Sequence, residues 1–466
     1  MRKQFPVFDC DAHVNDPVEI WTQYVEPQYR ELVRETYWRD ERRTVVNGRA
    51  RSTGGSHADF GRYNVITISG PGIDKKTRRK LQFMPLDEEK QDYLDHKGAY
   101  DPHARVRDLD LLGIDQVMVI PTAMVGGYYF AENIEGAYAL ARAYNDWAED
   151  FCKPYPDRLF AAGWLPLQEP FNTVDEMQRI ARKGVRMALV RPIDARGNYP
   201  SQIYGMGVRA HWDRIFRTFE ETGMVVGMHT FPSEVVPRDV AHDRLTGFDR
   251  MYSPGQLVTR AAGDEGFAQG NNSQTLSFIY EATVWLAQVL LSGFLDRYPR
   301  MRMAILESNA TWLPGVLERL DRYFHLYANE RTARARRAPS EAYYDQCFIS
   351  FEGDEKLVFR QWDRFENTGV WASDTYHHDG ADAWSTLRHM QEAEVPEAVQ
   401  ARLMGANALR MYNIQPKVFV QEELPLPERP QWFPSRPEIE EFARAQADPR
   451  NFAKVQAQAA AAQKYR

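Results

Sequence analysis

Short apolar runs alternate with longer stretches of helical periodicity along most of this chain. Most of the short runs are continuously apolar, which is typical of parallel strands that are buried on both faces. Eight runs are expected to form strands: Phe5–Asp11, Gln116–Pro121, Leu159–Leu165, Arg186–Arg191, Met224–His229, Arg302–Glu307, Cys347–Phe351 and Gly369–Ser373. The helices expected between them include Ile134–Lys153, Thr173–Lys183, Val208–Thr222 and Trp312–Tyr327. This alternation predicts an α/β fold, specifically a (β/α)8 TIM barrel.

Two glycines mark boundaries between a predicted helix and the strand that follows it. Gly184 and Gly223 each stand after a helical stretch and before an apolar run. A left-handed residue commonly ends a helix, and glycine adopts that conformation without steric cost. We therefore expect both glycines to have positive φ angles.

Two long insertions and a tail depart from the strand–helix alternation. Residues 26–105 follow the first predicted strand, and residues 231–275 follow the fifth. Both would lie over the same mouth of the barrel and could form a lid, with peripheral decoration or a subunit contact as the alternative. The Pro-rich tail from Gln415 is expected to wrap the barrel or a neighbouring subunit. We therefore divide the chain into a barrel, residues 1–414, and a C-terminal extension, residues 415–466.

Charge and cysteine content argue against several classes of protein. A formal net charge of −7 over 466 residues gives no basic surface for nucleic acid, and the basic run at residues 331–337 is interpreted as a solvated helix face. Three scattered cysteines suit neither a disulfide framework nor a CxxC metal site. The sequence has no recognisable signal peptide or membrane helix. We expect a cytoplasmic homo-oligomer that acts on a small molecule, with no nucleic-acid or membrane partner.

Carboxylate and imidazole side chains stand at the ends of three predicted strands. Asp11 and His13, two residues apart, can project to the same side of the first strand. His229 closes the fifth strand and Asp374 follows the last. The carboxyl ends of the strands gather at one face of such a barrel, so these side chains are expected to meet there. Together they form a plausible site for a divalent ion, although each alone could be a cap or a hydrogen-bonded core residue.

Several short segments carry a resemblance to a known family. They are Asp9–His13, Asp110–Asp115, Tyr144–Trp147, Pro156–Leu159, Leu306–Ser308 with Trp312, Ser373–His377 and Gly405–Ala408. With these segments, most of residues 5–414 resembles the amidohydrolase superfamily, in the branch that includes gamma-resorcylate decarboxylase and aminocarboxymuconate-semialdehyde decarboxylase. The metal ligands that this resemblance implies are Asp11, His13, His229 and Asp374. Asp11 stands where a histidine is common in the family, and a set with two carboxylates suits one Zn²⁺ or Mn²⁺ ion.

The segment after the sixth predicted strand departs from that family's pattern. The well-known decarboxylases have a histidine there, whereas this chain has Glu307 and Ser308. Either side chain could contact the substrate or the metal-bound water, and Glu307 could instead orient His229. The missing imidazole weakens the decarboxylase interpretation. It leaves Glu307 as a candidate catalytic residue and Ser308 as a candidate substrate-binding residue.

Three further residues are candidates for the same site. His377 closely follows Asp374 and could donate to the substrate, hold Asp374, or simply begin a helix. Arg191 closes the fourth strand and could pair with a substrate carboxylate, with an ion pair inside the barrel as the alternative. Tyr129 lies in an aromatic run after the second strand and could contact a flat apolar substrate, although core packing explains such aromatics equally well.

Two reactions fit this set of residues. The main hypothesis is hydrolysis of a small aromatic or cyclic substrate, because a divalent ion lowers the pKa of bound water from about 15.7 towards roughly 7. Asp374 would then accept the water proton and pass it to the leaving group. The alternative is non-oxidative decarboxylation of an aromatic acid, in which the ion would chelate the carboxylate and an ortho hydroxyl. Asp374 would then protonate the ring carbon. A non-catalytic scaffold with a structural ion fits less well, because structural metal sites are closed whereas a barrel mouth is open.

Overall fold

Nine parallel strand segments form the eight strands of a (β/α)8 barrel. The computed structural model describes residues 1–14, 17, 19–31, 43–46, 49–52, 97–122, 134–165, 169–190, 210–230, 278–330, 334–377 and 380–447. The barrel strands are β1 (Phe8–Val14), β4 (Gln116–Pro121), β5 (Leu159–Ala161), β6 (Gly163–Trp164), β7 (Met187–Val190), β8 (Val225–His229), β9 (Met303–Leu306), β10 (Cys347–Phe351) and β11 (Gly369–Trp371). They pair in the orders β1–β4–β5 and β11–β10–β9–β8–β7–β6.

Backbone contacts join these two sheets into one barrel. β5 and β6 are two parts of the third barrel strand, separated by Ala162. Between the last strand and the first, Asp374 donates its N–H to the carbonyl of Asp11 at 3.0 Å. Ala12 also forms an isolated parallel bridge with Thr375. The closing contacts therefore lie at the edge of the barrel that carries the predicted metal ligands.

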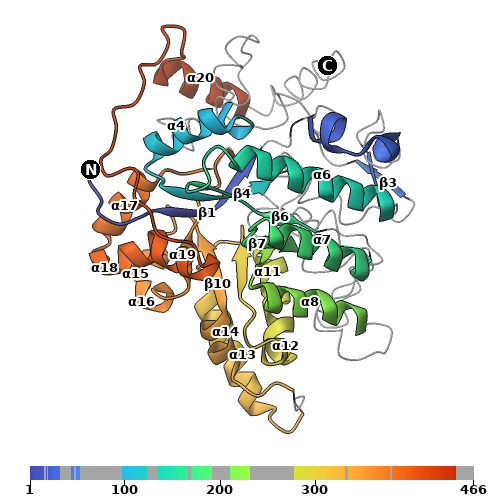
Figure 1. The fold of residues 1–466 in the computed structure, drawn as a ribbon. Helices are drawn as coiled ribbons and strands as arrows, with labels where there is room; N and C mark the ends of the chain where they lie inside the picture. The colour runs from blue at the N-terminus through green and yellow to red at the C-terminus, as the bar shows by residue number, and fades with distance from the viewer. Residues whose placement is uncertain are drawn as a thin grey trace.

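Helices surround the barrel in the order expected of alternating strands and helices (Figure 1). They are α4 (Pro102–Leu112), α6 (Ile134–Cys152), α7 (Pro170–Arg182), α8 (Ala210–Thr222), α11 (Phe278–Leu291), α12 (Phe294–Arg297), α13 (Leu313–Leu326), α14 (Pro339–Gln346), α15 (Lys356–Arg360), α16 (Trp362–Phe365), α17 (Ala383–Glu392), α18 (Glu397–Ala401), α19 (Asn407–Tyr412) and α20 (Arg436–Ala447). Gly184 and Gly223 have φ angles of 90° and 73°, which confirms the left-handed helix ends expected of them. None of the helices in the described ranges is long and apolar enough to cross a membrane.

The remaining described elements are short. They are η1 (Ile20–Tyr24), η2 (Pro27–Tyr29), β2 (Arg43–Val46), β3 (Arg49–Ser52), η3 (Lys97–Ala99) and η9 (Arg402–Ala406). β2 and β3 pair as an antiparallel hairpin within the first predicted insertion. The second predicted insertion, residues 231–275, lies outside the described residues, so the lid and the domain division stay predictions.

Successive residues of each strand pack on opposite sides of the barrel wall. Met118 and Leu189 belong to the inner cluster, which also contains Tyr412 of α19. Val226 and Trp371 belong to the outer cluster, which packs against the helices. Burial of each such side chain contributes about 1.5–3 kcal/mol, so the two clusters together fix both faces of the wall. Because both faces are apolar, the strands read as continuous apolar runs, as the sequence predicted.

A β-bulge in β1 changes which of its side chains point inwards. β1 takes three residue steps between Asp9 and Ala12, whereas β4 takes two between their partners. Cys10 packs in the inner cluster, but Ala12 packs in the outer one. The extra residue thus reverses the alternation, which turns Asp11 and His13 towards the barrel mouth.

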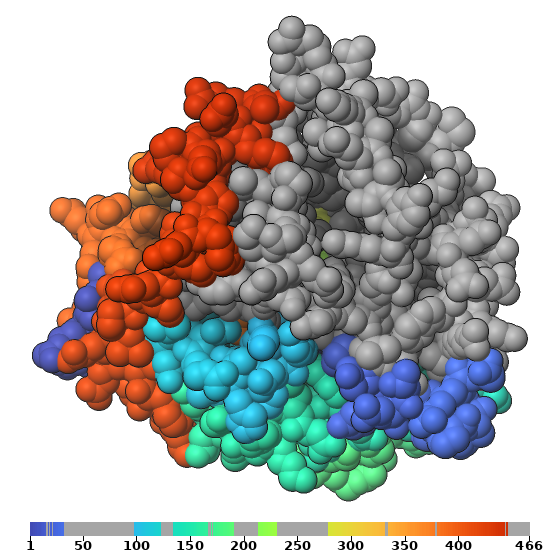
Figure 2. Space-filling model, turned by 90° about the horizontal axis from the view of Figure 1, so that it is seen from above, coloured from blue at the N-terminus to red at the C-terminus, as the bar shows by residue number. Residues whose placement is uncertain are grey.

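The C-terminal segment runs along the outside of its own barrel. Phe419 and Val420 donate their N–H groups to Oδ1 of Asp115 at 2.7 and 2.8 Å. Glu422 forms an antiparallel bridge with Arg2. Figure 2 shows this segment, in orange to red, beside the cyan surface that includes α4. Of the two arrangements expected for the tail, its described part adopts the one in which it packs on the barrel.

We predict that Asp115→Ala destabilises the protein by about 3–5 kcal/mol, because it leaves the Lys3 ammonium buried without its counter-charge. Both side chains of this ion pair are fully buried, and Asp115 also accepts the N–H of Val7 at 2.8 Å. Urea unfolding of the metal-free protein measures the change. The matched control is Glu422→Ala, which breaks the exposed pair with Arg2 and should cost less than about 1 kcal/mol. Equal losses in the two variants would contradict the prediction.

Candidate metal centre

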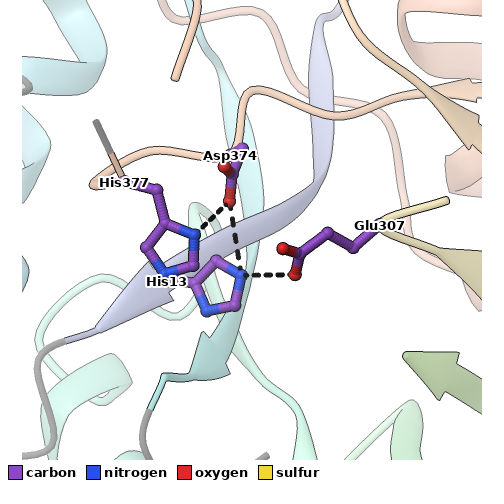
Figure 3. A group of neighbouring side chains, drawn as sticks. All are labelled: His13, Glu307, Asp374 and His377. Carbon is purple, nitrogen blue, oxygen red and sulfur yellow. Dashed lines mark ion pairs between the residues drawn. The ribbon is translucent and has the colours of Figure 1, made fainter. Parts of the chain in front are cut away.

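The four predicted metal ligands meet at the carboxyl ends of the strands, and Glu307 joins them. Figure 3 shows two of the four, His13 and Asp374, together with Glu307 and His377. Nε2 of His13 lies 3.2 Å from Asp11 Oδ1, 3.5 Å from Asp374 Oδ1 and 3.8 Å from Glu307 Oε2. Nε2 of His229 lies 3.7 Å from Asp11 Oδ2 and 2.8 Å from Glu307 Oε2. Separations of this size are typical of donor atoms around a small cation, and the two groups of donors share His13.

Hydrogen bonds to backbone carbonyls fix the tautomers of the two central imidazoles. Nδ1 of His13 lies 3.0 Å from the carbonyl of Pro121, and Nδ1 of His229 lies 2.7 Å from the carbonyl of Thr230. Because a carbonyl can only accept, both Nδ1 atoms must carry the hydrogen. Burial, followed by the charges of nearby histidines, holds the pKa of His13 well below its usual value. The lone pair of its Nε2 therefore faces the carboxylates, in the orientation that metal-binding histidines adopt.

The donor set fits a divalent cation. Oδ1 of Asp11 and Nε2 of His13 are buried, and neither makes a hydrogen bond within the part of the chain that the structure describes. A carboxylate oxygen and an imidazole lone pair 3.2 Å apart repel one another in a medium of low dielectric constant. A cation between them converts this repulsion into attraction, as happens in zinc and manganese sites built from carboxylates and imidazoles.

The turn after β9 holds Glu307 in a conformation that non-glycine residues rarely adopt. Glu307 and Asn309 have φ angles of 52° and 55°, in the left-handed region. The Glu307 carbonyl accepts the hydroxyl of Thr230, and its N–H donates to Ser350 Oγ at 3.2 Å. Glu355 accepts the N–H groups of the two residues after Asn309 at 2.9 and 3.2 Å. These bonds from three neighbouring segments stabilise the strained turn.

Asp374 also has a left-handed backbone, with a φ angle of 53°. The fully buried Asp9 accepts both the N–H of Ser373, at 2.9 Å, and its hydroxyl. Desolvation by burial raises the pKa of Asp9 to about 7 against the effect of these hydrogen bonds. Asp9 thereby ties the segment that carries Asp374 to the strand that carries Asp11 and His13.

His377 lies against Asp374, in the position expected of a residue that holds this carboxylate. Its Nδ1 is 2.7 Å from Asp374 Oδ1, and its Nε2 is 3.5 Å from Thr122 Oγ1. Its ring stacks on His13, with the centroids 3.9 Å apart and an interplanar angle of 21°. Among the alternatives left by the sequence, this geometry favours a role beside Asp374 over that of a helix-start residue.

The predicted substrate-binding residues are less informative. Ser308 is fully buried, and its hydroxyl donates to the carbonyl of Asn309 at 3.1 Å. Arg191 and Tyr129 lie outside the described residues. Contact of these three residues with a substrate therefore stays a prediction.

Arg105 supports the centre from behind the barrel wall and was not predicted from the sequence. It is fully buried in α4, and its Nη2 donates to the carbonyl of His13. Its Nε donates to the carbonyl of Gly98 at 2.8 Å, and its guanidinium lies 4.7 Å from the ring centroid of Tyr376. A side chain at position 98 would collide with the Tyr376 hydroxyl, so glycine allows this packing. Arg105 thus contacts two of the segments that provide ligands, the end of β1 and the segment after β11.

We predict that Arg105→Lys weakens binding of Mn²⁺ or Zn²⁺ by about 10–100-fold, the usual cost of losing a residue that positions metal ligands. A lysine cannot bond both carbonyls and stack on Tyr376. Competition with a metal-binding dye measures the affinity. Arg158→Lys is the matched control, because Arg158 also bonds two carbonyls and stacks on an aromatic ring, at the other end of β4. Equal metal affinity in both variants would contradict a positioning role for Arg105.

The stability contributed by Glu355 should fall as the pH rises. Desolvation by burial raises the pKa of its carboxyl from 4.5 to about 7, although backbone and Asn309 N–H groups favour the charged form. Between these values the folded protein holds a proton that the unfolded chain has lost, so its contribution is present below 4.5 and lost as the pH passes 7.

The free energy of unfolding of the metal-free wild type, relative to Glu355→Gln, should therefore fall by roughly 3 kcal/mol between about pH 4.5 and pH 7.5. Urea titrations at several pH values measure this difference. A difference that increases with pH would show that the N–H donors outweigh burial.

The chain is similar to known proteins in sequence and in fold. A family model described as amidohydrolase matches residues 8–414. Gamma-resorcylate decarboxylase from Rhizobium sp. (strain MTP-10005) is 25% identical over 188 residues, which cover 40% of this chain and 49% of that protein. Gamma-resorcylate decarboxylase from Rhizobium radiobacter is 24% identical over 242 residues, which cover 51% of this chain and 64% of that protein. The chain thus matches about half to two thirds of the length of these relatives.

Solved structures with the same fold extend over most of the chain. An amidohydrolase from Mycobacterium avium subsp. paratuberculosis superimposes with a TM-score of 0.63 at 18% identity, and covers 88% of this chain and all of that one. A 5-carboxyvanillate decarboxylase from Novosphingobium aromaticivorans, complexed with manganese and 4-hydroxy-3-methoxy-5-nitrobenzoic acid, gives a TM-score of 0.55 at 19% identity, covering 88% of this chain and 96% of that one. Because the family model covers most of the residues that form the barrel and its strand-end cluster, this chain belongs to the amidohydrolase family.

Proposed function

We propose that this protein is a metal-dependent, non-oxidative decarboxylase of a hydroxylated aromatic acid. The observation that carries the proposal is the cluster at the barrel mouth, in which the Nε2 atoms of the imidazoles face carboxylate oxygens. The decarboxylases among the relatives favour this reaction over hydrolysis, the main hypothesis from the sequence. The manganese in the 5-carboxyvanillate decarboxylase favours Mn²⁺ over Zn²⁺.

A divalent ion held by Asp11, His13, His229 and Asp374 would supply Lewis-acid polarisation of the substrate's carboxylate and hydroxyl oxygens. The chain's own groups keep this centre in place before substrate arrives. The carbonyls of Pro121 and Thr230 hold the imidazole rings, while Asp9 holds the segment that leads to Asp374. Such preorganisation lowers the cost of reaching the transition state, because no ligand has to be reoriented during the reaction.

Asp374 is the residue that we expect to supply the proton. The proton goes to the ring carbon that bears the carboxylate, the bond from that carbon to the carboxylate breaks, and its electron pair returns to the ring as carbon dioxide leaves. Water then returns a proton to Asp374. His377, 2.7 Å from Asp374 and partly exposed, is placed to pass this proton inwards.

A second candidate function is hydrolysis, and the position of Glu307 favours it. Oε2 of Glu307 lies at the mouth of the centre, 2.8 Å from His229 Nε2. A carboxylate in this position could accept a proton from an attacking water. The two reactions therefore differ in which carboxylate moves the proton and in which direction.

We predict that the protein loaded with Mn²⁺ or Zn²⁺ releases carbon dioxide from at least one acid in a panel of hydroxybenzoates and methoxy-hydroxybenzoates. Chelation should abolish this release, and re-addition of the ion should restore it, because the substrate oxygens lose their Lewis acid. Carbon dioxide capture and chromatography of the decarboxylated product provide the measurement. A parallel panel of lactones and amides tests the second candidate. Hydrolysis without carbon dioxide release would overturn the decarboxylase proposal in favour of that candidate.

A further inference from the structure

We propose that Glu307 is a fifth protein ligand of the metal ion, and not only a partner that orients His229. The centre would then contain three carboxylates and two imidazoles. This inference rests on the metal centre of the proposed function, but it does not depend on which reaction that centre catalyses.

The contact between Glu307 and His229 calls for a cation. Their facing atoms, Oε2 and Nε2, lie 2.8 Å apart. Nδ1 of His229 donates its hydrogen to the Thr230 carbonyl, so the ring in its neutral form presents only the lone pair of Nε2 to Glu307. A carboxylate oxygen also presents only lone pairs. A carboxylate that orients a histidine normally accepts its ring N–H. The Nδ1–H of His229 is instead bonded to the Thr230 carbonyl, and Glu307 faces Nε2.

The same ion would satisfy the other facing atoms. Oε2 of Glu307 lies 3.8 Å from Nε2 of His13, which in turn faces Asp11 at 3.2 Å and Asp374 at 3.5 Å. A proton on His229 would relieve its own contact with Glu307, but it would leave the lone pair of His13 facing carboxylates. One shared cation accounts for both imidazoles together.

The backbone at Glu307 is held in a conformation from which its side chain points towards His13 (Figure 3). Its left-handed φ of 52° is maintained by the bonds to Thr230 and Ser350 described above. A residue in a strained conformation that its neighbours stabilise is typical of functional sites. Asp374, three residues after the end of β11, has a similar left-handed φ of 53°.

Exposure distinguishes Glu307 from the other donors. Its side chain is 20% exposed, compared with 2% for Asp11 and for His229. Glu307 is therefore the ligand on the open side of the centre, where the substrate would arrive.

The test compares the affinities of Glu307→Gln for two metals. Mn²⁺ prefers more, and harder, oxygen donors, whereas Zn²⁺ is satisfied by the four remaining ligands. We expect the variant to lose at least about 10–100-fold in Mn²⁺ affinity and clearly less in Zn²⁺ affinity. A loss of that size already follows when a residue that only hydrogen-bonds to a metal ligand is removed. Dye competition on the full-length metal-free protein measures both, and the Mn²⁺ electron paramagnetic resonance spectrum should change with the altered ligand set.

The matched control is Glu352→Gln, which removes the same charge from the same rim of the barrel. Glu352 follows β10 and accepts the side-chain N–H of Asn309 at 3.1 Å. Its affinities for both metals should stay within about threefold of wild type, because screened charges outside the centre contribute little. Mn²⁺ and Zn²⁺ affinities that fall equally in Glu307→Gln, or do not fall, would overturn the assignment even if the protein is a decarboxylase.

A crystal structure of the Mn²⁺-loaded wild type provides a second measurement that needs no variant. A Glu307 oxygen within about 2.0–2.3 Å of the ion supports ligation. A shortest distance beyond about 3 Å overturns it and leaves Glu307 as an orienting residue. Absence of carbon dioxide release would refute the proposed reaction but would leave this distance, and the inference, unaffected.

Discussion

The active end of this protein depends on one electrostatic constraint: buried lone pairs that face one another require a positive charge between them. The carbonyls of Pro121 and Thr230 accept hydrogen bonds from Nδ1 of His13 and His229, and so turn the Nε2 atoms towards carboxylates. Water cannot relieve the resulting repulsion at low cost, because the groups are buried. Folding therefore prepares an attraction for a cation, and binding energy of the ion becomes stability of the folded protein.

Barrel closure and assembly of the centre are the same structural event. The bulge in β1 brings Asp11 and His13 to the barrel mouth. The hydrogen bonds that Asp9 accepts from Ser373 attach the last strand to the first. Arg105 contacts the same two segments from the outer side of the wall. A perturbation of this seam should thus change metal binding before it changes the rest of the barrel, whose inner and outer clusters are extensive.

The sequence predicted the strands well because their burial on both faces leaves an unmistakable apolar run, as for Gln116–Pro121 and Cys347–Phe351. It misplaced the first strand by three residues and missed the split between β5 and β6, since bulges and breaks do not alter composition. The four predicted ligands do meet, because strand ends converge in any such barrel. Arg105 could not be foreseen, since an arginine in a helix normally indicates a solvated position.

The location of protons and charges gives a way to choose between the two reactions. Hydrolysis needs a free base to accept a proton from water, whereas decarboxylation needs an acid to deliver one to carbon. A Glu307 bound to the ion would be a weaker base than an unbound carboxylate, so the fifth-ligand proposal weakens the observation that favoured hydrolysis. Asp374 keeps a proton-transfer partner in His377, whose Nδ1 faces Asp374. The Nε2 of His377 lies near the Thr122 hydroxyl, and the side chain is partly exposed. The ligand role proposed for Glu307 and the acid role proposed for Asp374 are therefore linked, and together they favour loss of carbon dioxide.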